Sequence, residues 1–89
     1  MKKNIIHKVP EGKLLRIEVE IKNSTIKEIE ITGDFFIHPE KDLLKIEKKL
    51  KEVKVNQVKK VIKKFIKENK TKIVGFSPED LQKALLKKE

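Results

Sequence analysis

The sequence predicts an α+β domain in which an antiparallel β-hairpin or three-stranded sheet is covered on one face by about three helices. Much of residues 13–32 alternates between apolar and charged side chains, the period of two that marks a half-buried strand. Residues 43–85 instead place apolar side chains three or four positions apart, as amphipathic helices do. An apolar strand face needs a cover, and the helices can supply it. The 89 residues suffice for a single domain, 1–89, with a modest core.

The strands are predicted from two alternating segments joined by a short turn. The first spans residues 13–21, and its apolar face consists of Leu15, Ile17, Val19 and Ile21. The second begins near residue 28 and, if unbroken, continues through Gly33 to residue 37. Asn and Ser in the turn at 22–25 favour local turns, so the two strands are expected to pair as an antiparallel hairpin. Residues 4–9 form either a third strand or an extended arm, ended by the Pro10-Glu11-Gly12 segment.

Three helices are expected after the strands. His38-Pro39 ends the second strand, because a residue before proline favours extended geometry and proline suits the first turn of a helix. The first helix has its apolar stripe at Leu43, Leu44, Ile46, Leu50 and Val53. The second is expected to begin after an Asn56 N-cap and to bury Val58, Val61, Ile62, Phe65 and Ile66. An extended link at 73–76 leads to the third helix, which Ser77 caps and which buries Leu81, Ala84 and Leu85.

Charge is distributed unevenly along the chain. The sequence contains 23 Lys and Arg against 14 Asp and Glu, a formal net charge of +9, and Arg16 is the single arginine. Residues 41–72 hold thirteen Lys against four acids, which accounts for the whole surplus. The second helix is predicted to present a basic face made of Lys59, Lys60, Lys63, Lys64 and Lys67. This face is either a solvated helix surface or one that steers an acidic partner or binds nucleic acid.

Composition excludes several kinds of chemistry. Cysteine is absent, which excludes disulfides, thiol nucleophiles and Cys-ligated metal centres. No glycine-rich phosphate loop and no recognisable catalytic set is present, so we expect no catalysis and no cofactor or metal bound by the chain alone. The apolar segments are too short for a membrane span or a signal peptide, which predicts a soluble, cytoplasmic protein. Enrichment in Lys and Glu is typical of a thermophile, and a gene of low GC content would have a similar composition.

The segment around Phe36 is the strongest candidate for a binding surface. If the second strand is unbroken, Phe35 and Ile37 face the core, and the outer face presents Leu14, Asp34, Phe36 and His38. An exposed Phe36 would then mark an interface with another protein. The alternative is a bulge at Gly33 that turns both phenylalanines inward, and His38 could equally be a helix cap or a surface residue.

A resemblance to a known family emerges from three segments. Residues 9–17 (Val-Pro-Glu-Gly-Lys-Leu-Leu-Arg-Ile), 29–36 (Ile-Glu-Ile-Thr-Gly-Asp-Phe-Phe) and 75–81 (Gly-Phe-Ser-Pro-Glu-Asp-Leu) resemble the C-terminal domain of lipoate–protein ligases. The similarity covers nearly the whole chain. As a free-standing domain, the chain is similar to the small accessory subunit of bipartite archaeal ligases.

The resemblance implies an accessory function in protein lipoylation. It implies a heterodimer in which a separate catalytic subunit binds lipoate, ATP and Mg²⁺ and makes lipoyl-adenylate, then transfers the lipoyl group to a lysine of an acceptor protein. The small subunit is implied to be needed for activation rather than transfer. Gly12 and Lys13 match a Gly-Lys pair of the family that could approach the partner's active site, although Lys13 could be merely an exposed strand start. The implied fold is similar to iron–sulfur scaffold and sulfur-transfer accessory proteins (SufE/NifU-like), whose cysteines this chain lacks.

Two functions therefore compete at the level of the sequence. The first is an accessory subunit that binds a catalytic lipoate–protein ligase subunit and, transiently, lipoyl-acceptor proteins. The alternative is a small basic nucleic-acid-binding module. Nucleic-acid sites usually add arginines and stacking aromatic side chains, and this chain has one Arg, no Trp and no Tyr. Composition therefore favours the first function.

Overall fold

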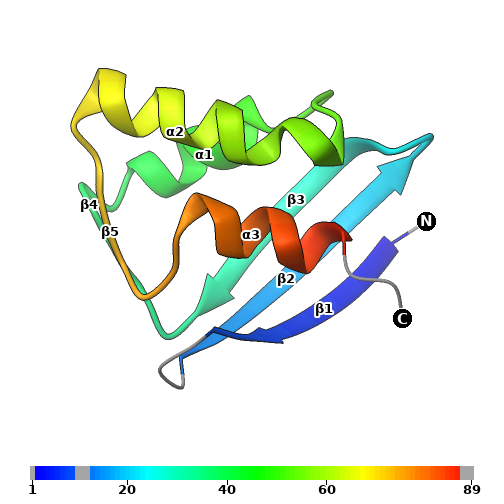
Figure 1. Cartoon of the computed structure of the whole chain (residues 1–89), viewed down its shortest axis with the longest axis horizontal. Coiled ribbons are helices and arrows are strands. Elements are labelled where there is room, and N and C mark those ends of the chain that lie inside the picture. Colours follow the sequence, from blue (N-terminus) through cyan, green and yellow to red (C-terminus); the bar gives the residue numbers. More distant parts are fainter. Residues whose placement is uncertain (1, 10–12, 87–89) are drawn as a thin grey trace.

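The computed structural model describes residues 2–9 and 13–86, and it is an α+β domain with two sheets and three α-helices. A three-stranded antiparallel sheet has the order β1-β2-β3, and a two-stranded sheet pairs β4 with β5. Figure 1 shows the helices gathered on one side of the larger sheet, with β4 and β5 forming a separate arm. In chain order the elements are β1 (Lys2–Lys8), β2 (Leu14–Lys22), β3 (Thr25–Gly33), β4 (Phe36–His38), α1 (Asp42–Lys49), the 3₁₀ turn η1 (Val55–Gln57), α2 (Val58–Asn69), β5 (Lys72–Val74) and α3 (Pro78–Leu86).

The three-stranded sheet confirms the predicted hairpin and resolves the first segment as a strand. Its inward face is buried, as the alternation predicts, and carries Ile5, Leu15, Ile17, Val19, Ile29 and Ile31. Asn23 and Ser24 form the turn between β2 and β3 with positive φ angles of 53° and 62°, the geometry that suits a tight hairpin. The helices cover this inward face through Ile46, Leu50, Val58, Ile62, Phe65, Leu81, Ala84 and Leu85, which join the same core cluster.

The prediction of an unbroken second strand is wrong, because β3 ends at Gly33. Gly33 has a φ of 144°, and a Cβ at this position would collide with the carbonyl oxygen of Leu14. The next residue, Asp34, donates its backbone N–H to that same oxygen at 3.0 Å, which turns the chain out of the sheet. Residues 36–38 then form β4 in the second sheet, where Ile37 pairs with Ile73 of β5. The expected extended link at 73–76 is therefore partly a strand.

The first two helices differ from the prediction at their ends. Helix α1 ends at Lys49, so Val53 lies beyond it. The chain after α1 is held by β3 instead, because Glu52 N–H donates to the Ile26 carbonyl at 2.7 Å and Ile26 N–H donates to the Val53 carbonyl at 2.9 Å. Asn56 lies within η1 and is not the N-cap of α2. The side chain of Gln82 in α3 accepts the Lys59 N–H at 2.8 Å and so serves a free donor of the first turn of α2.

The start of α3 is confirmed in detail. Asp80 N–H donates to Ser77 Oγ at 3.2 Å, and Ser77 N–H donates to Asp80 Oδ2 at 2.9 Å. This reciprocal arrangement is a capping box with aspartate in place of the usual glutamate. Pro78 occupies the first helical position, as predicted.

The small sheet is anchored to the rest of the domain on its inner side. The rings of Phe35 and Phe76 meet edge to face, with centroids 4.9 Å apart and an interplanar angle of 88°. Gly75 lies directly against Phe35, since a Cβ on Gly75 would approach the Phe35 Cβ to 2.8 Å. Thr71, just before β5, donates its hydroxyl to the buried Asp42 carboxylate at 2.6 Å. These contacts hold the orientation of β4 and β5. No helix among residues 2–9 and 13–86 is both long and apolar enough to cross a membrane.

Candidate functional site

Phe36 lies on the outside of the small sheet, as the interface hypothesis requires. Its side chain is 78% exposed, whereas Ile37 beside it is only 8% exposed. The alternative in which a bulge turns both rings inward is therefore wrong. Phe36 pairs across the strands with Val74, which is 55% exposed, so the two form one apolar pair on the outer surface. Sequence reasoning missed Val74 because residues 73–76 carry too short a pattern to reveal a strand.

The other residues of the predicted interface are only partly brought together. Asp34 and His38 are exposed on either side of Phe36 along the chain, and His38 pairs with Lys72 of β5. Leu14 is half-buried and belongs to β2, in the other sheet. Because the chain turns at Gly33, the expectation that Leu14 and Phe36 share one strand face is wrong.

The proposed approach to a partner's active site rests on Gly12 and Lys13. Gly12 lies outside the described residues. Lys13 is exposed immediately before β2, and its carbonyl accepts the Val9 N–H at 2.8 Å, which closes the connection between β1 and β2. An exposed lysine at the start of a strand would occupy the same position without any function. The approach of Lys13 to a partner's active site therefore stays a prediction.

The basic face of α2 is present as predicted. All five of its lysines are exposed: Lys59, Lys60, Lys63, Lys64 and Lys67. Lys63 forms an ion pair with Glu79 of α3 at 2.9 Å, and this contact lowers the pKa of Glu79 from its ordinary value. The face therefore presents concentrated positive charge from one helix, which suits attraction of an acidic partner.

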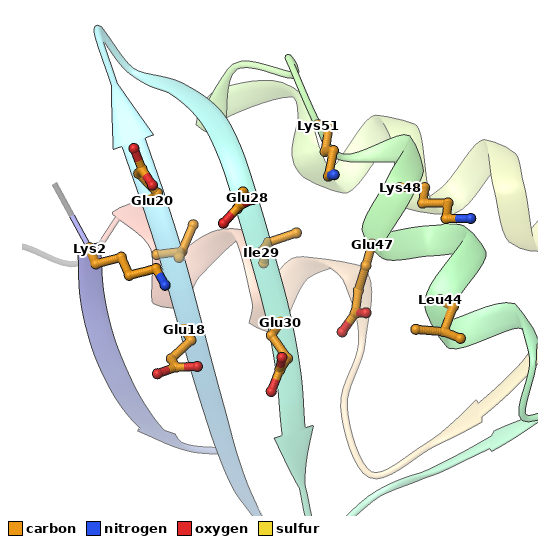
Figure 2. A pocket seen from close by; sticks show the side chains of 11 residues that line it. Lys2, Glu18, Glu20, Glu28, Ile29, Glu30, Leu44, Glu47, Lys48 and Lys51 are labelled. Carbon is orange, nitrogen blue, oxygen red and sulfur yellow. The ribbon is translucent and has the colours of Figure 1, made fainter.

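An acidic groove that the sequence did not reveal runs from the outer face of the larger sheet, which points away from the core, past the edge of β3 to α1. It has a volume of about 290 Å³ and lies between β3 and α1. Figure 2 shows its glutamates projecting from β2 and β3 on the same face, with Glu47 reaching in from α1. The carboxylates are those of Glu18, Glu20, Glu28, Glu30 and Glu47, and Lys2, Lys48 and Lys51 also line the groove. The alternation along the strands indicates that the four strand glutamates face away from the core. Only the pairing of β2 with β3 shows that these glutamates are neighbours across the two strands.

Glu47 joins α1 to the edge of the larger sheet. Its Oε2 accepts the backbone N–H of Ile31 at 2.8 Å, so α1 satisfies a hydrogen-bonding group of the outer strand β3. Burial raises the pKa of Glu47 above its ordinary value, the hydrogen bond from Ile31 lowers it, and the negative charge of Glu30 raises it further. The net direction is upward, because desolvation is the largest of the three effects.

Comparison with known proteins places these features in a family. A sequence model of the family described as bacterial lipoate protein ligase C-terminus matches residues 2–85. The chain belongs to this lipoate–protein ligase C-terminal family. The similarity inferred from residues 9–17, 29–36 and 75–81 is thus confirmed.

Two relatives of this lipoate–protein ligase family come from Thermoplasma acidophilum. The protein named Lipoate-protein ligase A subunit 2 is 31% identical over 72 residues, which are 81% of this chain and 76% of that protein. The second is a solved chain from a structural analysis of an archaeal lipoylation system, a bi-partite lipoate protein ligase and its E2 lipoyl domain. It is 27% identical, with a TM-score of 0.82, and the match covers 99% of this chain and 98% of that chain. The fold of the lipoate–protein ligase C-terminal family therefore extends over the whole described structure.

Proposed function

We propose that this chain is the accessory subunit of a two-component lipoate–protein ligase. It acts with a separate catalytic subunit in the ATP-dependent activation of lipoate to lipoyl-adenylate. The observation that supports this most strongly is the nearly full-length match, 99% of one chain and 98% of the other, to a chain from a bi-partite lipoate protein ligase. The name of the other relative, Lipoate-protein ligase A subunit 2, supports the same proposal.

The apolar pair Phe36 and Val74 is the proposed anchor for the catalytic subunit. A large aromatic side chain that is 78% exposed in the free domain gains most from burial in a partner's pocket. Asp34 and His38 flank the anchor and would contribute polar contacts around it. Lipoate, ATP and Mg²⁺ would bind through the catalytic subunit, and the basic face of α2 would attract an acidic lipoyl-acceptor protein.

Two further expectations follow from this proposal. A subunit of a lipoylation enzyme is expected in the cytoplasm of its cell. The expected similarity to iron–sulfur scaffold proteins concerns the fold alone, because the cysteines that such chemistry requires are absent from the sequence. The alternative of a nucleic-acid-binding module is not favoured, since the family relationship and the acidic face of the larger sheet both argue against it.

The test is reconstitution with the catalytic lipoate–protein ligase subunit of the same genome. The two chains are co-expressed and purified, and formation of lipoyl-adenylate from lipoate, ATP and Mg²⁺ is measured with and without this chain. We expect co-purification and adenylate formation that depends on this chain. Transfer of the lipoyl group from chemically prepared lipoyl-adenylate serves as the control, and it should proceed without this chain. Full adenylate formation by the catalytic subunit alone would refute the proposal.

A further inference from the structure

The helix-free face of the larger sheet is strongly polarised in charge. Strand register arranges its side chains in rows across β1, β2 and β3. Two rows at the β2–β3 turn end are acidic, namely Lys2–Glu20–Glu28 and Asn4–Glu18–Glu30. The next row is Ile6–Arg16–Thr32, in which Ile6 is 62% exposed. The face therefore combines an exposed apolar residue with a block of four glutamates.

The acidic block is unfavourable in the free domain. Glu18 lies directly opposite Glu30, and Glu20 directly opposite Glu28, and like charges in such positions destabilise a sheet. The ion pairs of the described residues join Lys27 to Glu52, Lys45 to Asp42 and Lys63 to Glu79, and so none of them neutralises the four glutamates. This occurs in a chain with 23 basic residues and a net charge of +9. Lys2, Lys48 and Lys51 line the acidic groove, but none of these ion pairs joins them to the four glutamates. A cationic group that covers the block would relieve the repulsion that remains.

The shape of the face indicates the kind of cation. Two shallow grooves, of about 290 and 370 Å³, share Glu18 and Glu30 and so form one continuous surface that extends to Ile6 and Thr32. Within residues 2–9 and 13–86, no three His, Cys, Asp or Glu side chains converge closely enough to hold a metal ion. The carboxylates are instead spread along two strands. Such a spacing fits several cationic side chains of an extended surface, with an apolar neighbour over Ile6.

We propose that this face docks a lysine- or arginine-bearing segment of the catalytic subunit. The inference rests on the proposed function and adds a second contact surface to the Phe36–Val74 anchor. Charge complementarity selects the orientation, because the basic face of α2 belongs to the helical layer on the other side of the sheet (Figures 1 and 2). Arg16 marks the limit of the acidic block, so the cationic segment lies over Glu18, Glu20, Glu28 and Glu30.

The test compares two charge-matched double variants of the full chain. The docking variant is Glu18→Gln with Glu30→Gln, and the control is Glu40→Gln with Glu68→Gln, which removes two exposed carboxylates elsewhere. Affinity for the catalytic subunit is measured by calorimetry at low and high salt, and thermal melting of each free chain is recorded. We expect the docking variant to bind on the order of tenfold more weakly with a flatter salt dependence, while its melting temperature stays level or rises. The control should bind within about twofold of the native chain, because exposed charges far from the docking face are largely screened by salt.

The outcomes separate this inference from the proposed function. If the native chain fails to bind the catalytic subunit, the proposed function fails and the inference with it. If the native chain binds and the docking variant binds equally well, only the inference is refuted. Salt-sensitive self-association of the free chain that the docking variant abolishes would assign the face to a second copy instead. Micromolar binding of Mg²⁺ that the docking variant abolishes would assign it to a metal, and either result overturns the proposal.

Discussion

Replacement of Phe36 by alanine is expected to separate assembly from folding. Because 78% of the side chain is already exposed, only about a fifth of it leaves water when the free domain folds. Full burial of a phenylalanine contributes about 1.5 to 3 kcal/mol, so the free domain should lose only about 0.5 kcal/mol. Loss of a buried aromatic anchor from an interface costs about 2 kcal/mol or more, roughly a thirtyfold loss of affinity. Phe36→Ala should therefore weaken binding to the catalytic subunit and lipoate activation.

The matched control is Phe35→Ala, one residue away with the opposite environment. Phe35 is half-buried, meets the Phe76 ring edge to face at 4.9 Å, and packs against Gly75. A fully buried phenylalanine costs about 3 to 5 kcal/mol when truncated, and the partial exposure of Phe35 reduces this to about 2 to 4 kcal/mol. In a domain of this size, such a loss lowers the melting temperature by on the order of 10 °C or more.

The assays are thermal and urea unfolding of each free variant, followed by calorimetric titration into the catalytic subunit. Phe36→Ala should unfold close to the native chain and bind poorly. Phe35→Ala should unfold early, and its affinity should be measured at a temperature where it remains folded. The reasoning is refuted if Phe36→Ala destabilises the free domain as much as Phe35→Ala, because the ring would then be part of the core. It is also refuted if Phe36→Ala binds the catalytic subunit with native affinity.

Four further variants and one binding experiment test other contacts. Glu47→Ala leaves the Ile31 N–H without its acceptor and should cost about 1 to 3 kcal/mol in urea unfolding, whereas Glu47→Gln retains an acceptor and should match or exceed native stability at pH 7. The pKa of Glu47 in the folded chain is raised above its ordinary value of 4.5, so the folded chain binds a proton at Glu47 at a higher pH than the unfolded chain does. The free energy of unfolding should therefore rise as pH falls through the folded pKa towards 4.5. Glu47→Gln should abolish this pH dependence. Thr71→Val removes the hydroxyl donor to buried Asp42 and should cost on the order of 1 to 3 kcal/mol, which urea unfolding at pH 7 would show; native stability in this variant would contradict the contact. A further variant replaces by Gln the four lysines Lys59, Lys60, Lys63 and Lys64. Its association with an acidic lipoyl-acceptor protein, measured by stopped flow, should be slower and less salt-dependent, while its melting temperature should stay the same or rise. Unchanged rates would show that this face is merely solvated. Calorimetry of the free chain with ATP, Mg²⁺ and lipoate should show no heat beyond dilution, and micromolar binding would contradict the assignment of these ligands to the catalytic subunit.

Local patterns were sufficient wherever the cause of a structure lies within a few residues. The period-two alternation around Ile17 and Ile31 predicted the buried sheet face, because side chains of a strand alternate between its two sides. The apolar spacing in α2 predicted its buried face, and Ser77-Pro78 predicted the start of α3. Both features depend on neighbours only three or four residues away. The exposure of Phe36 also followed from alternation with buried Ile37, even though the strand was assigned to the wrong sheet.

The sequence by itself thus determined the fold class, most element types and buried faces, and the lysine-rich surface of this chain, although Leu44 of the predicted first stripe is 64% exposed. Tertiary structure alone decided where those elements end and what they meet. The Leu14 carbonyl beside Gly33 ends β3, Ile26 holds the chain after α1, and Gln82 serves the first turn of α2. Both candidate surfaces depend on such distant pairings: Val74 reaches Phe36 only through β5, and the glutamates form one acidic block only through the register of β2 with β3. Contacts between residues far apart in the chain leave no periodic trace in either segment, so the folded arrangement is what reveals them.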